Sequence, residues 1–342
     1  MRVVITGGAG FIGQRLARRI LALGKLVDSA GEEREVTRLV LNDVAEPVDS
    51  LPVDKRVEFI AGDFGEPTVL ERLITPDTAI VFHLAAVVSG GAEEDFELGM
   101  QVNLHATECL LEGLRLLDTC PRLVFASSVA AYGGDLPEVI QDDTLLAPQT
   151  SYGCQKAMTE FLINDYSRRG FLDGRALRLP TIVVRPGKPN KAASSFASAI
   201  IREPLQGETC VCPVPPETGV WVLSPQQVVE SFIHAEQLAA STWGYQRALA
   251  LPGLTTTVSE MIEALESIGG PAAVARIEWK PDAGVQRIVH SWPVRFQPTR
   301  ALDMGFQPDA SIVDCIEGFV RDELGGQVAS TGRQKFAIRT GS

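Results

Sequence analysis

The sequence has 342 residues, of which 45% are hydrophobic and 22% are charged, a composition typical of a globular protein with one large α/β unit or two coupled domains. Its net charge is −12 and its pI is near 4.9, which argues against nucleic acid or an anionic membrane as the main partner, because both require a basic surface. No run reaches the roughly 18 apolar residues of a membrane span, and the chain starts as a strand rather than as a signal peptide, so we expect a cytoplasmic protein.

The six cysteines and four histidines form no metal-binding pattern. Only Cys210 and Cys212 are close in sequence, no zinc-ligand spacing is present, and no two histidines stand four positions apart. We therefore expect no metal site and interpret the histidines as packing or surface residues.

The chain opens with the pattern of a strand, a glycine loop and a helix. Residues 2–6 are apolar, and Leu16, Ile20 and Leu23 then recur at helical spacing. A glycine loop between these elements leaves backbone N–H groups free at the helix N-terminus, where they suit a pyrophosphate. We therefore predict a dinucleotide site that includes Gly7, Gly10, Phe11, Ile12 and Gly13.

A second strand, predicted at 37–41, ends in Asn42 and Asp43. An acidic side chain there can accept hydrogen bonds from the adenosine ribose, and its charge opposes the 2′-phosphate of NADP. The next basic residue is Lys55, so we predict a preference for NAD over NADP. The polar stretch 24–35 lengthens the connection before this strand, which leaves open whether Asn42 or Asp43 binds the ribose, or whether Asp43 only caps the following turn.

Further strand patterns at 57–61, 79–83, 123–126 and 175–179 alternate with helical ones. The helical pattern at 102–117 follows the fourth strand, and a second at 157–166 repeats apolar residues at Ala157, Phe161, Leu162 and Tyr166. Strands that alternate with helices in this way predict a parallel, doubly wound sheet.

Tyr152 and Lys156 stand four positions apart at the start of that second helical pattern, so they share one helical face. A free phenol has a pKa of about 10, and lowering it to neutrality takes roughly 4 kcal/mol. An ammonium about 4 Å away supplies energy of this order at an effective dielectric of about 20. The pair therefore predicts a tyrosinate general base, although a tyrosine and a lysine alone are also ordinary helix-surface residues.

Together these motifs resemble the extended short-chain dehydrogenase/reductase family, of the NAD-dependent epimerase/dehydratase type. The resemblance covers about the first 185 residues, and its motifs follow the family's order: the glycines of 7–13, Asp63 and Phe64, Leu84, Ala85 and Ala86, Asn103, Ser127 and Ser128 with Tyr132 and Gly133, and Tyr152 with Lys156. It implies a Rossmann fold that binds NAD through these motifs.

The same resemblance implies a catalytic group of Ser128, Tyr152 and Lys156, in which Ser128 takes the hydroxyl role because it stands four residues before Tyr132. The family pattern places Ser127 at the nicotinamide. Backbone of the segment after the sixth strand is implied to bind the nicotinamide carboxamide, namely Pro180, Thr181 and Ile182.

The character of the sequence changes after Gly187, where Pro-rich pieces alternate with short helices. The family implies a Rossmann domain at 1–185, with returns near 225–251, and a smaller, interleaved C-terminal substrate-binding domain at 186–324. Residues 325–342 are polar and unpatterned, and we interpret them as a tail.

Two positions separate the reactions of this family. Its dehydratases place Asp-Glu directly after the catalytic hydroxyl, where this chain has Val129 and Ala130, so water elimination lacks its acid. Its nucleotide-sugar epimerases carry an Asn and a Gly-Pro after the sixth strand. This chain has Thr181 and Arg185-Pro186 there, which disfavours a 4-epimerase without excluding it.

A basic loop follows the nicotinamide segment, and it suits a compact anion such as a carboxylate unless it is only a solvated surface loop. The run 179–195 that contains it resembles the NAD-dependent D-erythronate dehydrogenases, which oxidise the C2 hydroxyl of a four-carbon sugar acid to the 2-oxo acid. We therefore expect a small anionic sugar acid as substrate. The candidate substrate residues are Ser89, Ser128, Tyr152, Arg185, Asn190 and Lys191.

Three other functions stay open. A uronate or another aldonate dehydrogenase and a nucleotide-sugar 4-epimerase would use the same fold and cofactor. A non-catalytic dinucleotide-binding regulator is the third, although such family members usually lack the Tyr or Lys that this chain retains. We expect a homodimer or a higher homo-oligomer.

Overall fold

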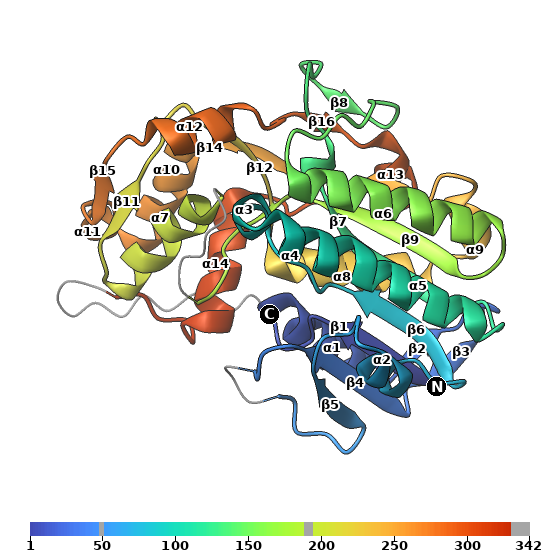
Figure 1. Ribbon diagram of the computed structural model, residues 1–342. Helices are drawn as coiled ribbons and strands as arrows, with labels where there is room; N and C mark the ends of the chain where they lie inside the picture. Colours follow the sequence, from blue (N-terminus) through green and yellow to red (C-terminus); the bar gives the residue numbers. More distant parts are fainter. Residues whose placement is uncertain (48–50, 188–193, 330–342) are drawn as a thin grey trace.

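The centre of the molecule is a seven-stranded sheet with the strand order β13-β9-β7-β6-β1-β4-β5 (Figure 1). This computed structural model describes residues 1–47, 51–187 and 194–329. All six strand pairs are parallel, which confirms the predicted doubly wound sheet. The strands are β1 (Arg2–Thr6), β4 (Arg38–Asp43), β5 (Val57–Ala61), β6 (Thr78–His83), β7 (Arg122–Ser128), β9 (Asp173–Leu179) and β13 (Ala248–Ala250).

Helices cover both faces of this sheet because apolar side chains alternate along its strands. In β1, Val3 and Ile5 join one buried cluster while Val4 joins the opposite one. The helices of the first face are α1 (Phe11–Leu23) and α8 (Pro225–Gln237), and those of the second are α2 (Pro67–Leu73), α5 (Ala106–Leu116) and α6 (Ser151–Arg168). The result is the three-layered Rossmann arrangement, in which the carboxyl ends of the strands share one edge.

The polar stretch after α1 folds into an antiparallel hairpin rather than a plain link. Its strands are β2 (Lys25–Val27) and β3 (Glu33–Glu35). The turn between them is held by Asp28, whose Oδ1 accepts hydrogen bonds from the N–H groups of Ala30 and Glu32, both at 3.0 Å. This hairpin accounts for the long interval between the glycine loop and Asp43.

A second apolar core lies beside the sheet, on the left of Figure 1. Ile200, Met261 and Ile316 are fully buried in it. Its larger helices are α7 (Ser195–Gln206), α10 (Val258–Gly269) and α14 (Ile312–Glu323), with the shorter α11 (Pro271–Val274) and α12 (Ala283–His290). Its strands are β10 (Thr181–Ile182), β12 (Gly219–Leu223) and β14 (Leu254–Thr257) in one sheet, and β11 (Cys210–Cys212) and β15 (Ile277–Trp279) in another.

The chain crosses between the two units more often than the sequence predicted. Near 225–251, α8 packs on the sheet and β13 pairs with β9 at its edge. Helix α13 (Thr299–Asp303) belongs to the range expected to form the substrate domain, but it packs against the core of the sheet. Ala301 and Phe306 are buried in that core, and the Phe306 ring lies edge-on to the Trp243 ring, with the ring centres 6.3 Å apart. In addition, β16 (Phe296–Gln297) pairs with β8 (Ile140–Gln141).

The beginning of the predicted tail is packed. Val328 contacts the second core, and the N–H of Ala329 donates to the carbonyl of Leu205 at 2.8 Å. The first residues of the predicted tail are therefore held by an apolar contact and by backbone hydrogen bonds, which include those from Gly326 to Val320 and from Gln327 to Leu324. Residues 330–342 lie outside the described residues. Within the described part of the chain, no helix has the length and apolar composition needed to cross a bilayer.

Helix α6 packs through three of its four predicted apolar positions, since Ala157 is buried and Leu162 and Tyr166 lie partly buried against the core. Ile163 is also buried, but Phe161 is 68% exposed. The remaining buried face includes the charged Glu160, which an apolar-spacing rule cannot select. Its burial is explained by an ion pair with Arg178 on β9.

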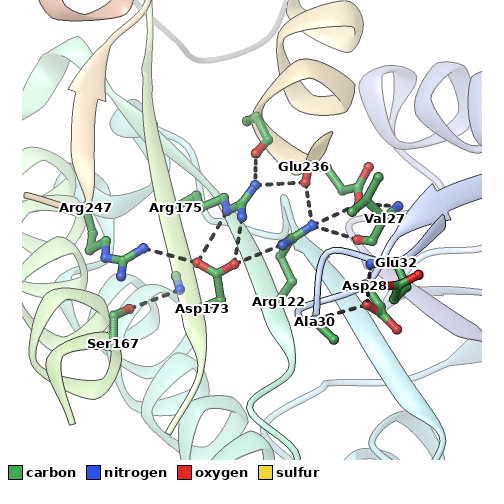
Figure 2. Close-up of polar contacts among 12 residues, drawn as sticks. Val27, Asp28, Ala30, Glu32, Arg122, Ser167, Asp173, Arg175, Glu236 and Arg247 are labelled. Carbon is green, nitrogen blue, oxygen red and sulfur yellow. Dashed lines mark hydrogen bonds and ion pairs between the residues drawn. The ribbon is translucent and has the colours of Figure 1, made fainter. Parts of the chain in front are cut away.

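A buried ion network joins the amino ends of β7 and β9, at the edge of the sheet opposite the carboxyl ends (Figure 2). Asp173 accepts from Arg122 Nε at 3.0 Å, from Arg175 Nη2 at 2.6 Å and from Arg247 Nη1 at 3.1 Å. Burial opposes ionisation of Asp173, but the Arg175 and Arg122 guanidinium groups hold its pKa below the usual value. Removing one partner of such a network typically costs about 3–5 kcal/mol, so it fastens these strands.

Candidate active site

The carboxyl ends of the strands face one cavity of about 1210 Å³, which is also lined by residues of the second core. Nearly all residues expected from the sequence line it: Gly7, Gly10, Phe11, Ile12, Gly13, Asn42, Asp43, Asp63, Phe64, Leu84, Ala85, Ala86, Ser89, Ser127, Ser128, Tyr152, Lys156, Pro180, Thr181, Ile182 and Arg185. Asn103 does not line it, and Asn190 and Lys191 lie outside the described residues.

The glycine loop has no room for a side chain at several positions, of which Gly7 and Gly13 are the tightest on the cavity side. Gly7 has a φ of 70°, and a Cβ there would lie 2.8 Å from the N atom of Ala85. A Cβ on Gly13 would lie 2.3 Å from the carbonyl oxygen of Gly7. Gly10 then caps α1 without a side chain, and the first turn of α1 holds no acidic residue, so its N–H groups suit a phosphate.

Asp43 reaches the glycine loop, whereas the Asn42 side chain is bonded within the protein. Asn42 is fully buried, and its Nδ2 donates to the carbonyls of Ile60 and Gly62 at 2.9 Å each, which fixes the loop after β5. One carboxylate oxygen of Asp43 accepts from the N–H of Ala9 at 3.2 Å, which joins it to the glycine loop. The other accepts from Ala45 at 3.4 Å, so Asp43 caps the following turn as well as lining the cavity.

Asn103 acts behind the cavity wall. It lies in the π-helical turn Gln101–His105, and its amide exchanges hydrogen bonds with the backbone of Val87 at 2.8 and 3.0 Å. Its Nδ2 also donates to Gln155 Oε1 at 2.7 Å. The expectation of a cofactor contact is therefore replaced by a supporting role, because both ends of the amide are already bonded to protein.

Ser128, Tyr152 and Lys156 meet at the end of β7. They do so because the first turn of α6 packs directly against the turn Val129–Ala131, which follows β7. Thr150 caps α6 by accepting from Gly153 N at 3.1 Å. A Cβ on Gly153 would lie 2.1 Å from the carbonyl oxygen of Ala130, so only glycine permits this approach. It brings the phenol of Tyr152 close enough to the Ser128 hydroxyl for that group to lower the pKa of the tyrosine.

Lys156 lies beneath this pair. Its Nζ donates to the carbonyl of Ala126 at 2.9 Å and stands 4.5 Å from the centre of the Phe125 ring and 5.5 Å from that of Tyr152. Burial lowers the pKa of Lys156 to about 7, an effect that the charge of Glu160 opposes. The side chain is therefore well placed but carries its charge only partly at neutral pH.

The electrostatics of Tyr152 differ from the prediction. Burial raises the pKa of Tyr152 to about 12, and the groups that act against this rise are the Ser128 hydroxyl and Arg185 rather than Lys156. The predicted depression by the lysine is absent here because desolvation affects both groups. The protein alone therefore favours a neutral phenol.

Arg185 is a desolvated cation close to Tyr152. Burial and the neighbouring Arg202 lower its pKa, while the interaction with Tyr152 opposes that change. Its Nη2 donates to Ser194 Oγ at 3.1 Å, and Arg202 holds its carbonyl oxygen at 2.7 Å. Among the described residues no carboxylate pairs with the Arg185 guanidinium, so this cation is available to an anion. The other basic residues of the predicted loop, Lys188 and Lys191, lie outside the described residues.

Sequence reasoning missed one whole wall of the cavity. Glu93 lines it from α3 (Ser89–Glu94), and its carboxylate accepts from the N–H of Ser151 at 2.5 Å. The apolar part of this wall comes from the second core and includes Trp221, Val285, Ile288, Trp292, Pro293 and Val294. No motif marks these residues, because they reach the cavity only through long-range packing.

The geometry fits NAD in three independent features. The glycine loop presents a helix N-terminus, Asp43 stands where a ribose would meet the loop, and small residues at 84–86 leave space for a flat ring. On the described residues, no group of three or more His, Cys, Asp or Glu side chains could hold a metal ion.

Comparison with known proteins agrees with this geometry. The NAD dependent epimerase/dehydratase family matches residues 3–245. A D-erythronate dehydrogenase of Cupriavidus necator is 53% identical, over 94% of this chain and 98% of the relative, and one of Haemophilus influenzae is 46% identical, over 95% and 100%. The crystal structure of a nucleoside-diphosphate-sugar epimerase from Agrobacterium tumefaciens is 41% identical with a TM-score of 0.90, over 96% of this chain and 95% of the other.

The sequence resemblance is thereby confirmed over most of the chain. The family match spans the sheet except for β13, and the relatives extend the similarity through the second core. The chain belongs to the NAD dependent epimerase/dehydratase family, and NAD is its cofactor.

Proposed function

We propose that this protein is an NAD-dependent dehydrogenase that oxidises the C2 hydroxyl of D-erythronate to the 2-oxo acid. The observation that carries the proposal is Arg185, a desolvated guanidinium without a carboxylate partner among the described residues, close enough to Tyr152 to act on its pKa. A substrate carboxylate paired with Arg185 would place the adjacent C2 hydroxyl at the phenol. The names of the two relatives at 53% and 46% identity support the same choice.

The chemistry follows from the side chains. Tyr152, as phenolate, takes the proton of the C2 hydroxyl, and Ser128 donates a hydrogen bond to the same oxygen. The C2–H bond then breaks with its electron pair as the C=O bond forms. NAD⁺, when bound, accepts this hydride. Lys156 holds its ammonium beneath the phenol and stabilises the phenolate when it is charged.

The test is NADH formation from NAD⁺ with a panel of aldonates, uronates and sugar nucleotides. We expect turnover with D-erythronate at the highest kcat/KM, and lower values for longer sugar acids. Turnover of another aldonate or a uronate alone would keep the mechanism and change the substrate. No oxidation of any sugar acid would reject the proposal.

A nucleotide-sugar 4-epimerase is the second candidate, favoured by the name of the solved structure at 41% identity. Against it stand Thr181 and Arg185, where epimerases of the family carry an Asn and a Gly-Pro. Conversion of UDP-sugars without net NADH formation would favour this candidate. Tight NAD binding without turnover of either class would instead favour a regulator.

We also propose that the protein works in the cytoplasm as a homodimer or a higher homo-oligomer. The neighbouring helices α4 (Phe96–Met100) and α6 expose Phe96, Met158 and Phe161, an apolar surface that a second copy would cover. Light scattering of the purified protein measures the oligomer, and cell fractionation measures the location.

A further inference from the structure

A buried ion pair lies directly behind the catalytic side chains. Arg178 on β9 grips the carboxylate of Glu160 on α6, with Nε at 3.0 and 3.1 Å from its two oxygens and Nη2 at 2.7 Å from Oε2. Glu160 is 4% exposed and Arg178 is 7% exposed. Such a pair is bidentate and charge-assisted, so it fixes both the distance and the relative orientation of the two elements.

The pair also holds the segment that carries Ser128, and it does so at both ends. Before Ser128, the hydroxyl of Ser127 donates to Glu160 Oε1 at 2.5 Å. After it, the Tyr132 hydroxyl accepts from Arg178 Nη1 at 2.7 Å, and the guanidinium lies over the Tyr132 ring at 5.0 Å. Between these points the chain forms the single 3₁₀ turn Val129–Ala131, whose N–H at Ala130 donates to Ser128 Oγ at 3.1 Å.

The Ser127 contact changes one sequence expectation. The family pattern places Ser127 at the nicotinamide, but its hydroxyl is already donated to Glu160 and the residue is only 2% exposed. Its hydroxyl proton therefore orients the strand end from within the cavity wall.

Each partner of the pair lies only a few residues along the chain from a residue of the site. Glu160 stands one helical turn after Lys156 on α6, and Arg178 stands two residues before Pro180 on β9. The Glu160–Arg178 pair therefore joins three separate parts of the site. These are α6, the 127–132 segment and the end of β9 that leads into Pro180. A buried pair of this kind adds little net stability over an apolar packing, so its placement calls for another explanation.

We propose that the Glu160–Arg178 pair is a positioning device for the reaction, which sets Ser128 against Tyr152 and keeps the ammonium of Lys156 opposite a negative charge. The proposal rests on the proposed function of Ser128, Tyr152 and Lys156.

The charges around Lys156 give the pair a measurable second effect. Burial lowers the pKa of Lys156, and Glu160 is the group that opposes this fall. On the β6 side of Lys156, burial and the lysine charge lower the pKa of His83 to about 3, so that ring is neutral. Tyr152 is a further titratable neighbour, with its ring centre 5.5 Å from Lys156 Nζ, and the charge of Arg185 acts on the pKa of that tyrosine. Loss of the Glu160 charge would therefore lower the pKa of Lys156 further. The ammonium would then be lost at a lower pH and would no longer stabilise the Tyr152 phenolate.

The test compares Glu160→Gln, Arg178→Met and the double variant with the parent protein. We expect Glu160→Gln to lower kcat by about 10- to 100-fold, the size of effect that small misplacement produces, with less than about threefold change in KM and in NAD Kd. The kcat–pH profile should move to higher pH. The double variant leaves no buried charge unpaired, so it should regain thermal stability over the single variants but keep the low kcat and the shifted profile.

The matched control is Asp173→Asn, which breaks the buried ion network at the other end of the same strand (Figure 2). It should lower the unfolding midpoint without moving the kcat–pH profile. Parental kcat and pH profile in the double variant would overturn the proposal, as would an equal profile shift in Asp173→Asn. If the parent oxidises no sugar acid, the proposed function fails separately. The phenolate absorbance of NAD⁺-bound Tyr152, titrated in parent and Glu160→Gln, then decides the positioning role, which an unshifted titration would reject.

Discussion

Replacing Arg185 by Met should separate substrate binding from cofactor binding. The methionine keeps much of the side-chain volume but removes the guanidinium, which has no carboxylate partner among the described residues and is partly desolvated beside Tyr152. A hydrogen-bonded ion pair to a carboxylate at such a site contributes about 1.5–3 kcal/mol. This range corresponds to a rise of roughly 10- to 150-fold in KM for the acid.

The assay is NADH formation with D-erythronate and, separately, with the uncharged four-carbon polyol, alongside NAD Kd by direct titration. We expect the loss to be confined to the acid, because the polyol has no carboxylate to lose. Arg168→Met is the control, since it removes an equally charged side chain from the exposed end of α6. Unchanged KM for the acid in Arg185→Met, or an equal loss for the polyol, would refute the carboxylate assignment.

Three further variants test other parts of the molecule. Tyr152→Phe should remove most turnover while NAD still binds, because the proton acceptor is lost and the ring stays; near-normal kcat would contradict the mechanism. Asp43→Ala should weaken NAD by roughly tenfold and narrow the preference over NADP, measured as the ratio of the two kcat/KM values, and an unchanged ratio would exclude Asp43 from the ribose site. Asp173→Asn should lower the free energy of unfolding by about 3–5 kcal/mol in urea, since three arginines share that buried carboxylate, and a loss below about 1 kcal/mol would show that the network is not fastening the strands.

The sheet and the cofactor loop could be predicted because their signals are local. Strand, glycine loop and helix follow one another within 25 residues, and the steric limits at Gly7 and Gly13 act between neighbouring segments. Parallel strands then bring their carboxyl ends to one edge, so the residues after β6, β7 and β9 had to meet. Most of the cavity was therefore implied by chain order alone.

The parts that could not be predicted depend on contacts between distant segments. Trp221 reaches the cavity from β12, and Phe306 returns to the first core from beyond the substrate-binding segments, with no motif to mark either. Glu160 interrupts the apolar face of α6, so spacing favoured Phe161, which is exposed. Asn103 belongs to a family motif, but its side-chain amide is hydrogen-bonded to Val87 and Gln155. In each case the deciding partner lies far away in sequence.

The protonation of Tyr152 shows why protein and cofactor must be considered together. Burial raises the pKa of Tyr152 to about 12 and lowers that of Lys156 to about 7, so below pH 12 the phenol is mostly neutral and above pH 7 the ammonium is mostly lost. Moving the tyrosine pKa to about 8 takes roughly 5 kcal/mol. A unit charge about 4 Å away at an effective dielectric of about 20 contributes about 4 kcal/mol, so the positive nicotinamide of NAD⁺, if bound at such a distance, would supply most of this shift.

NADH lacks that charge and is the natural control. We expect NAD⁺ to lower the pH at which phenolate absorbance of the protein develops, and NADH to leave it almost unchanged, with Tyr152→Phe removing the signal. In kcat/KM against pH at saturating NAD⁺, the base should titrate near pH 8, and Lys156→Met should move that titration only slightly upward, because the ammonium beneath the phenol is already mostly deprotonated at that pH. An equal shift with NADH would mean that desolvation or rearrangement, and not the charge, controls the base.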